Sequence, residues 1–262
     1  MPTGPWEKRQ VLMVVKAYPN PEDEYGEACC TAGVDDDDNW IRIWPIPFRD
    51  LRPDQKFKKW QWITATVRKS NDPRPESHEL QPDTIVLGDV VDTKRAWTKR
   101  LAVLAPHYVK SVEELQEMQK NGAQTMGTIR PREVLAFVIE ERDDPNWKAV
   151  QAAQLNQQGL FTAPKLALER IPYKFSYRFT CDDDKCKTIH KLQILDWEVA
   201  EAYRSWRAKY GPDGWEAAMH LKFSQELPGK DLIFIGNYIK YPARFGIVGI
   251  VYPPKPAQPD DS

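Results

Sequence analysis

The sequence predicts an α+β protein that is mainly β, and three observations carry this prediction. Its 262 residues include 22 prolines, which interrupt helices and central strands and therefore favour short strands joined by structured turns. Several segments alternate apolar and polar residues with a period of two, the longest over 56–70. Segments of helical pattern do not alternate regularly with the strands, which favours α+β over α/β.

The predicted strands of the first half are apolar or alternating segments bounded by turn residues. The segment 35–39, four aspartates and an asparagine, forms the turn of a predicted hairpin. Three prolines in 45–55 exclude a regular central strand there, and residues 71–80 are predicted to be a loop. Strands are predicted over 9–19, 28–34, 40–44 and 56–70 in this half, and over 133–141, 174–181, 190–195, 230–239 and 244–254 later.

Capping residues mark the ends of the predicted helices. Ser111 and Glu114 form a capping box, and Gly122 ends the same helix. Asp196 caps a later helix, and Asp213 with Glu216 is predicted to cap the last. The predicted helices cover 93–105, 111–122, 145–159, 196–211 and 213–227.

A polar, Gln-rich stretch over 140–165 predicts a boundary between two units. Short strands with many turns suit small, partly open barrels, so we expect two OB-like barrels with inserted helices. The expected division is an N-terminal OB-like unit over 1–142, a C-terminal β unit with a Cys/His element and two helices over 143–253, and a disordered tail over 254–262.

Tryptophan and basic residues share one face of two predicted strands. If the strands over 40–44 and 56–70 pair, this face offers indoles for stacking bases and cations for phosphates, as in single-strand nucleic-acid binding. Arg52, Lys56 and Lys59 lie close by in the sequence. The candidate binding residues are Trp40, Arg42, Trp44, Arg49, Lys58, Trp60, Trp62 and Arg68.

Two other interpretations of this face remain open. Tryptophans on a second strand face also pack beneath other elements, with arginine lying across their rings. Tryptophan and arginine are equally favoured at the centre of protein–protein interfaces, so a protein partner would also suit this face.

A Cys-x4-Cys-x3-His element suggests a structural zinc site formed by Cys181, Cys186 and His190. Only three ligands are local, so the fourth would come from elsewhere in the fold. The candidates for it are Cys29, Cys30, His107 and His220. The alternative interpretation is a pair of reduced cysteines beside an unrelated histidine.

Several enzyme classes lack their motifs in this sequence. It contains no GxxxxGK[ST], no GxGxxG after a strand and no GxSxG. A metal-dependent nuclease could use Asp196, Glu198, Asp231 and Lys240, although Asp196 also suits a helix cap. We therefore expect a non-enzymatic protein, with a nuclease as the alternative.

Charge and hydropathy limit the compartment and the partners. The net charge of -1 argues against binding nucleic acid by bulk charge, but it permits a local basic site. No apolar run approaches the roughly 20 residues of a membrane helix, and the N-terminal residues have no signal-peptide pattern. We expect a cytoplasmic protein with no membrane partner.

Several segments together resemble a family of prokaryotic proteins with a dual OB-containing domain. They are YGEACCTAG, WIRIWPIPFRDL, FKKWQW, DPRPES, the Cys/His element with its following LQILDWE, and KDLIFIGN. The similarity extends from Val11 to Tyr252. It implies two OB-like barrels and a role related to nucleic acids or nucleotides, in mobile-element or anti-phage systems, and it implies no catalytic residues. In that family the histidine lies closer to the second cysteine than His190 does here.

Overall fold

The computed structural model of the chain describes residues 4–156, 166–226 and 232–254. The fold is α+β and mainly β, as the sequence predicts, and it contains a closed five-stranded barrel. None of the described helices has both the length and the apolar character needed to span a membrane.

The N-terminal barrel follows the order β1-β3-β4-β6-β5 and closes where β5 pairs with β1. Strands β4 and β6 run parallel, while every other neighbouring pair in the barrel is antiparallel. Side chains that alternate with outward-facing ones fill its interior, among them Val11, Ile43 and Ile63. The strands are β1 (Glu7–Lys16), β3 (Gly26–Asp35), β4 (Trp40–Ile46), β5 (Gln61–Lys69) and β6 (Ser77–Leu80).

This connectivity is that of an OB-type barrel, a five-stranded Greek-key barrel. Two short strands lie beside it, because β2 (Asn20–Glu22) pairs with β3, and β7 (Val86–Val90) pairs with β5. Short 3-10 turns at Pro53–Gln55, Pro82–Thr84 and Ala105–His107 join the larger elements.

The second half contains two three-stranded sheets, ordered β11-β10-β9 and β13-β12-β8. They meet where Ile194 forms a β-bridge with Ile247, and again where β8 continues into β9 through Arg130. Together they enclose a separate core. The strands are β8 (Met126–Ile129), β9 (Pro131–Glu141), β10 (Tyr173–Cys181), β11 (His190–Gln193), β12 (Leu232–Tyr238) and β13 (Tyr241–Val251).

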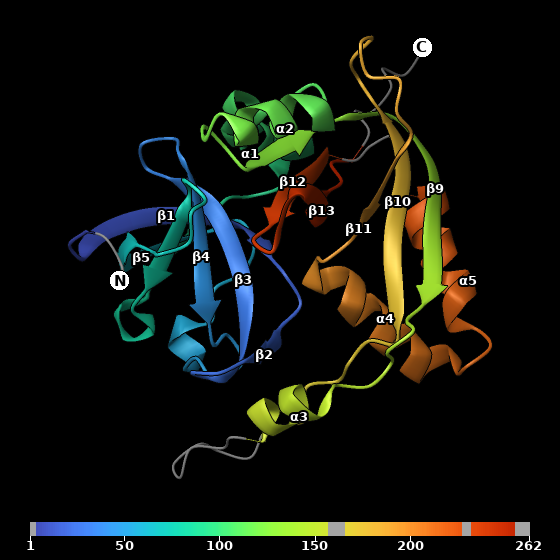
Figure 1. The fold of residues 1–262 in the computed structure, drawn as a ribbon, viewed down its shortest axis with the longest axis horizontal. Helices are drawn as coiled ribbons and strands as arrows, with labels where there is room; N and C mark the ends of the chain where they lie inside the picture. Colours follow the sequence, from blue (N-terminus) through green and yellow to red (C-terminus); the bar gives the residue numbers. More distant parts are fainter. Residues whose placement is uncertain (1–3, 157–165, 227–231, 255–262) are drawn as a thin grey trace.

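Helices α2, α4 and α5 cover the core of the second half. Val112, Tyr203 and Met219, one from each helix, are buried in the cluster that also contains Phe175 and Ile247. Helix α3 lies apart from the other helices, at the bottom of Figure 1, where it contacts β2. The helices are α1 (Lys94–Leu104), α2 (Val112–Lys120), α3 (Ala149–Leu155), α4 (Trp197–Tyr210) and α5 (Trp215–His220), followed by a π-turn at Leu221–Glu226.

Strands β12 and β13 lie between the barrel and the β9–β10–β11 sheet (Figure 1). Their side chains Phe234, Val248 and Val251 share a buried cluster with Leu12 and Trp40 of the barrel. The two halves therefore share an apolar interface, and the outer face of strand β4 contributes to it.

The expected elements differ from the structure at several points. Strand β6 lies inside the predicted loop 71–80, because a neighbouring strand in the closed barrel pairs with these polar residues. The last helix begins after Gly214 and lacks the predicted Asp213 cap. Strands β8 and β9 precede residue 142 yet pair with β12 and β10, and the domain division at 142 stays a prediction. Residues 255–262 of the predicted tail lie outside the described residues.

Candidate functional site

The predicted tryptophan face is divided in the structure. Strands β4 and β5 do not pair, because β6 lies between them in the barrel. The alternation within β4 is present, since Ile41 and Ile43 face the barrel interior while Trp40 joins the cluster between the halves. The candidate residues are therefore spread over several surroundings.

Trp40 and Trp60 are covered by the second half of the molecule. They are only 6% and 4% exposed, and the ring centroid of each lies near that of Phe234, at 5.9 Å for Trp40 and 6.4 Å for Trp60. The guanidinium of Arg100 lies 5.0 Å from the Trp60 ring centroid. These contacts match the packing interpretation, and neither ring is open to a base.

Four further candidate residues, of which Trp62 packs against the interface cluster, do not form one surface. Trp62 is half-buried against Gly88 of β7, and Lys58 is exposed. Arg49 forms an ion pair with Glu27, at 3.0 Å. Arg68 pairs with Glu79 at 2.7 Å and lies over the Trp6 ring. The two remaining candidates, Arg42 and Trp44, lie together in a different place.

Arg42 and Trp44 line a cavity of about 550 Å³ between the barrel and the second half. On the barrel side it is lined by strands β3 and β4, by the β1–β3 connection and by the β5–β6 connection. In an OB barrel, the second and third strands and the loops corresponding to these two connections bind the ligand. The barrel residues are Ala17, Tyr18, Asn20, Cys30, Arg42, Trp44, Asp72 and Arg74.

The second half supplies the opposite wall of the cavity. It contains aromatic and aliphatic side chains, together with two further arginines that follow β9 and precede β10. Pockets of this size, with aromatic lining and a few polar groups, are typical small-molecule sites. The principal residues are Arg142, Trp147, Arg170, Tyr173, Phe175, Gln193, Asn237 and Tyr238.

Arg42 is a buried charge without a carboxylate partner. It is 3% exposed, and its Nη2 donates to Oγ1 of Thr125 at 3.4 Å. Its Nε has no hydrogen-bond partner, and no carboxylate of the described residues lies within 4.0 Å of the guanidinium. Burial lowers the pKa of Arg42 and the like charge of Arg74 adds to this, while Cys30 and the Glu76 carboxylate oppose it. A buried cation in this setting favours an anionic ligand.

Arg74 and Arg170 of the cavity have more complete contacts than Arg42. Arg74 pairs with Asp72 and donates from Nη1 to the carbonyl of Asn237 at 3.0 Å. Arg170 pairs with Asp144 at 2.7 Å and lies 4.8 Å from the ring centroid of Trp147. These contacts fix the two side chains in the wall.

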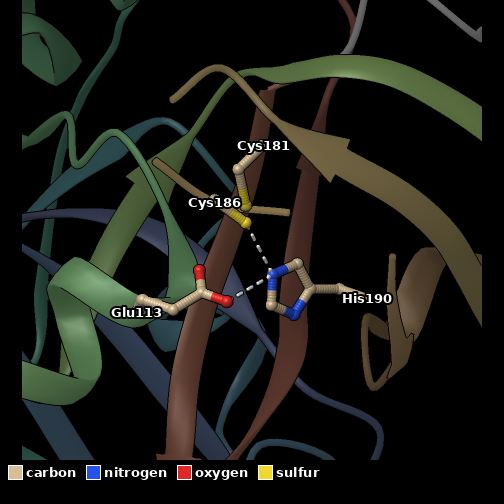
Figure 2. A group of neighbouring side chains, drawn as sticks. All are labelled: Glu113, Cys181, Cys186 and His190. Carbon is tan, nitrogen blue, oxygen red and sulfur yellow. Dashed lines mark hydrogen bonds and ion pairs between the residues drawn. The ribbon is translucent and has the colours of Figure 1, made fainter. Parts of the chain in front are cut away.

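The predicted metal ligands Cys181, Cys186 and His190 do come together (Figure 2). Cys181 ends β10 and His190 begins β11, so the antiparallel pairing of these strands closes the connection that carries Cys186. Sγ of Cys186 lies 3.4 Å from Nε2 of His190. Burial raises the pKa of the Cys181 thiol to about 12.

The fourth group of the cluster is Glu113, in the first turn of α2. Its Oε1 lies 3.2 Å from Nε2 of His190, and the four ligand atoms all lie within 4.8 Å of one another. The four fourth-ligand candidates lie elsewhere: Cys29 and Cys30 are in β3, His107 packs on Trp40, and His220 packs on Phe137. None of these candidates belongs to the cluster, and Glu113 lies there instead. The group can hold a metal ion.

The carboxylates of the alternative nuclease have structural contacts. Asp196 caps α4, accepting from the amide of Glu198, and its other oxygen accepts from the amide of Ile250. The ammonium of Lys59 lies 3.0 Å from the same oxygen. Lys240 is exposed, and Asp231 lies outside the described residues.

Sequence reasoning missed Arg74, Arg142, Trp147, Arg170 and Glu113. Arg74 lies within the DPRPES segment that supports the family resemblance, which was the available signal for it. Arg142 and Trp147 lie within the Gln-rich stretch and Arg170 follows it, and only the fold brings them to the barrel. Glu113 resembles an ordinary first-turn acid of a helix.

Two family models match the chain, and their matches meet near residue 107. Residues 7–106 match Domain of unknown function (DUF8758), which covers the N-terminal barrel. Residues 108–262 match Domain of unknown function (DUF8757). A comparison with curated proteins found no match. The resemblance to proteins with a dual OB-containing domain stays a prediction. Because the second match covers more than half of the chain, the protein belongs to the family described as Domain of unknown function (DUF8757).

Proposed function

We propose that this protein is a non-enzymatic binding protein for single-stranded nucleic acid, and that it takes a nucleotide of the strand into the cavity between its halves. The observation that carries this proposal is the position of Arg42. Its buried, unpaired guanidinium lies in a cavity built on the face that OB barrels use for ligands.

The charge and the aromatic lining favour a nucleotide among the ligands of OB barrels. Oligosaccharides also bind such barrels, but they carry no phosphate for a buried arginine. Four arginines and two carboxylates, Asp72 and Asp196, line the cavity. Each of these carboxylates already pairs with a cation, Arg74 or Lys59. The cavity is therefore suited to an anion.

Trp44 and Trp147 are the rings best placed to stack on a base. Each is half-buried, and they line the cavity from opposite walls. Stacking of a base on an aromatic side chain contributes about 1–3 kcal/mol per base. The proposed site is therefore smaller than the strand face predicted from the sequence. It is limited to the cavity between the two halves, which Trp44 of that face lines.

The experiment is an anisotropy titration with short, labelled single-stranded DNA and RNA. Trp44→Ala and Trp147→Ala should each weaken binding by about 1–3 kcal/mol, the range for one stacked base. Trp6→Ala is the matched control, because Trp6 is exposed and lies outside the cavity. Equal affinity for all four proteins, with the variants folded, would contradict the proposal.

We also propose that the cluster of Glu113, Cys181, Cys186 and His190 holds a structural zinc ion. Two thiolates, one imidazole and one carboxylate are ligand types that zinc takes in four-coordinate sites. A zinc ion there would tie helix α2 to the β10–β11 connection, and the cluster lies away from the residues that line the cavity.

Metal analysis of the purified protein tests the zinc proposal. We expect one zinc per chain, lost in Cys181→Ser and in Cys186→Ser. Cys30→Ser is the matched control, since Cys30 lies in β3 outside the cluster. Zinc content well below one per chain after purification and refolding in the presence of zinc would contradict this assignment.

A further inference from the structure

The arginines of the cavity form two pairs of like charge, and each pair belongs to a different wall. Arg42 and Arg74 come from strand β4 and from the β5–β6 connection of the barrel. Arg142 follows β9, and Arg170 precedes β10 in the second half. Whether an anion bound to one wall satisfies the other depends on which arginines already have a carboxylate partner.

The pair on the barrel wall is held against strand β12. A side-chain carbon at Gly236 would lie 3.1 Å from Nη2 of Arg42, so glycine leaves room for the guanidinium there. The adjacent residue, Asn237, accepts the hydrogen bond from Arg74. The two guanidinium groups therefore lie beside adjacent residues of one strand.

The pair on the opposite wall has a matching arrangement. Nε of Arg142 donates to the carbonyl of Ile171 at 3.0 Å, which orients this half-buried side chain. No carboxylate of the described residues lies within 4.0 Å of the Arg142 guanidinium. Burial lowers the pKa of Arg142, and the nearby charge of Arg170 lowers it further. Arg142 is thus the counterpart of Arg42.

Each wall therefore has one arginine with a paired carboxylate and one without. Arg74 and Arg170 each pair with a carboxylate, whereas the guanidinium groups of Arg42 and Arg142 can donate hydrogen bonds to a bound anion. Guanidinium groups bind phosphate oxygens well, often through two parallel hydrogen bonds. The aromatic rings of Trp44, Trp147 and Tyr173 line the same cavity.

We infer that the cavity recognises one nucleoside with a phosphate on each side, the repeating unit inside a nucleic-acid strand, with Arg42 and Arg142 each binding one of the two phosphates. This inference rests on the proposed function and specifies its ligand. A nucleoside 3′,5′-bisphosphate is the smallest compound with one nucleoside and a phosphate on each side, so it is the probe used to test this inference.

The experiment compares adenosine 3′,5′-bisphosphate with adenosine 5′-monophosphate, adenosine 3′-monophosphate and adenosine, by quenching of tryptophan fluorescence. A short oligoadenylate is titrated in parallel. The bisphosphate should bind at least about tenfold more tightly than either monophosphate, as expected for one added charge-assisted contact. In Arg142→Gln, the bisphosphate should bind no more tightly than one of the two monophosphates. In Arg178→Gln, it should still bind more tightly than both. Arg178 is the matched control because it is exposed on β10 and does not line the cavity.

The outcomes separate this inference from the proposed function. If the oligoadenylate binds but the bisphosphate and the monophosphates bind equally, the two-phosphate inference is wrong and the proposed function stands. If neither the oligoadenylate nor the bisphosphate binds to the folded protein, both are wrong. A bisphosphate preference that survives Arg142→Gln would overturn the role assigned to Arg142.

Discussion

The indole ring of Trp40 meets the phenyl ring of Phe234 edge to face, with ring centroids 5.9 Å apart. Trp40 comes from the barrel and Phe234 from β12, so this contact joins the two halves of the molecule. Edge-to-face aromatic pairs contribute about 0.5–1.5 kcal/mol beyond the area that they bury. Trp40 and Trp60 therefore stabilise the interface instead of opening onto solvent.

Trp60→Ala should therefore lower stability more than it lowers ligand affinity. Removing this buried ring leaves a void beside Phe234 and Leu104, at a cost of about 3–5 kcal/mol in the free energy of unfolding. Denaturant unfolding measures this change, with the exposed Trp6→Ala as the control. A Trp60→Ala protein of unchanged stability but weakened nucleic-acid binding would contradict the assignment of Trp60 to the interface.

Lys59 and Asp196 form a buried ion pair between the barrel and helix α4. Their side chains are 9% and 1% exposed, and Lys59 also pairs with Glu198, which is half-exposed. Burial acts to lower the pKa of Lys59, but the two carboxylates outweigh it and the net pKa is raised. Lys59 thus remains charged in the folded protein.

Lys59→Met should destabilise the protein by about 3–5 kcal/mol, because it leaves the Asp196 carboxylate buried without its cation. Glu198→Gln removes the exposed partner of the same lysine and should cost less than about 1 kcal/mol. Thermal or denaturant unfolding of the two variants gives the comparison. If both variants lost a similar amount of unfolding free energy, the burial of Asp196 would not explain the destabilisation in Lys59→Met.

His107 should make stability depend on pH. It is buried against Trp40, its Nε2 has no hydrogen-bond partner, and burial lowers its pKa, although Asp38 and Asp35 oppose this. A lowered pKa favours the neutral ring in the folded state. The resulting stability is present above the unfolded pKa of about 6.5 and is lost as pH falls through the folded pKa.

Unfolding measured from about pH 7.5 to about pH 5 should therefore show falling stability, with a smaller fall in His107→Gln. His220→Gln is the control, since His220 is more exposed and lies in helix α5. An identical pH profile for wild type and His107→Gln would contradict this account, because the wild-type slope would then come from other groups.

Local sequence patterns predicted much of the fold, for identifiable physical reasons. The alternation in β4 and the Asp196 cap of α4 depend on neighbours in the sequence, and both are present. Ser111 likewise accepts from the amide of Glu114, as its capping box predicts. Strand β6 could not be predicted in this way, because its four residues pair only when the barrel closes.

The candidate site was predictable only in its local parts. Cys181, Cys186 and His190 lie within ten residues, so their spacing alone indicated the cluster, whereas Glu113 reaches it only through the packing of α2. Arg42 and Trp44 were identified by composition. Their partners across the cavity, Arg142 and Trp147, lie about a hundred residues later in the chain and join them through the interface of the two halves. Burial of Trp40 and Trp60 follows from the same interface and has no signal in the sequence around them.

Photo-crosslinking tests the location of the proposed binding site most directly. A short single strand with a photoreactive base would be crosslinked to the full chain, and the modified residues would be identified by mass spectrometry. The account predicts crosslinks to Trp44, Trp147 or Tyr173, which line the cavity. Saturable crosslinks confined to Lys58, Trp62 and the outer barrel surface, with none to residues of the cavity, would contradict it.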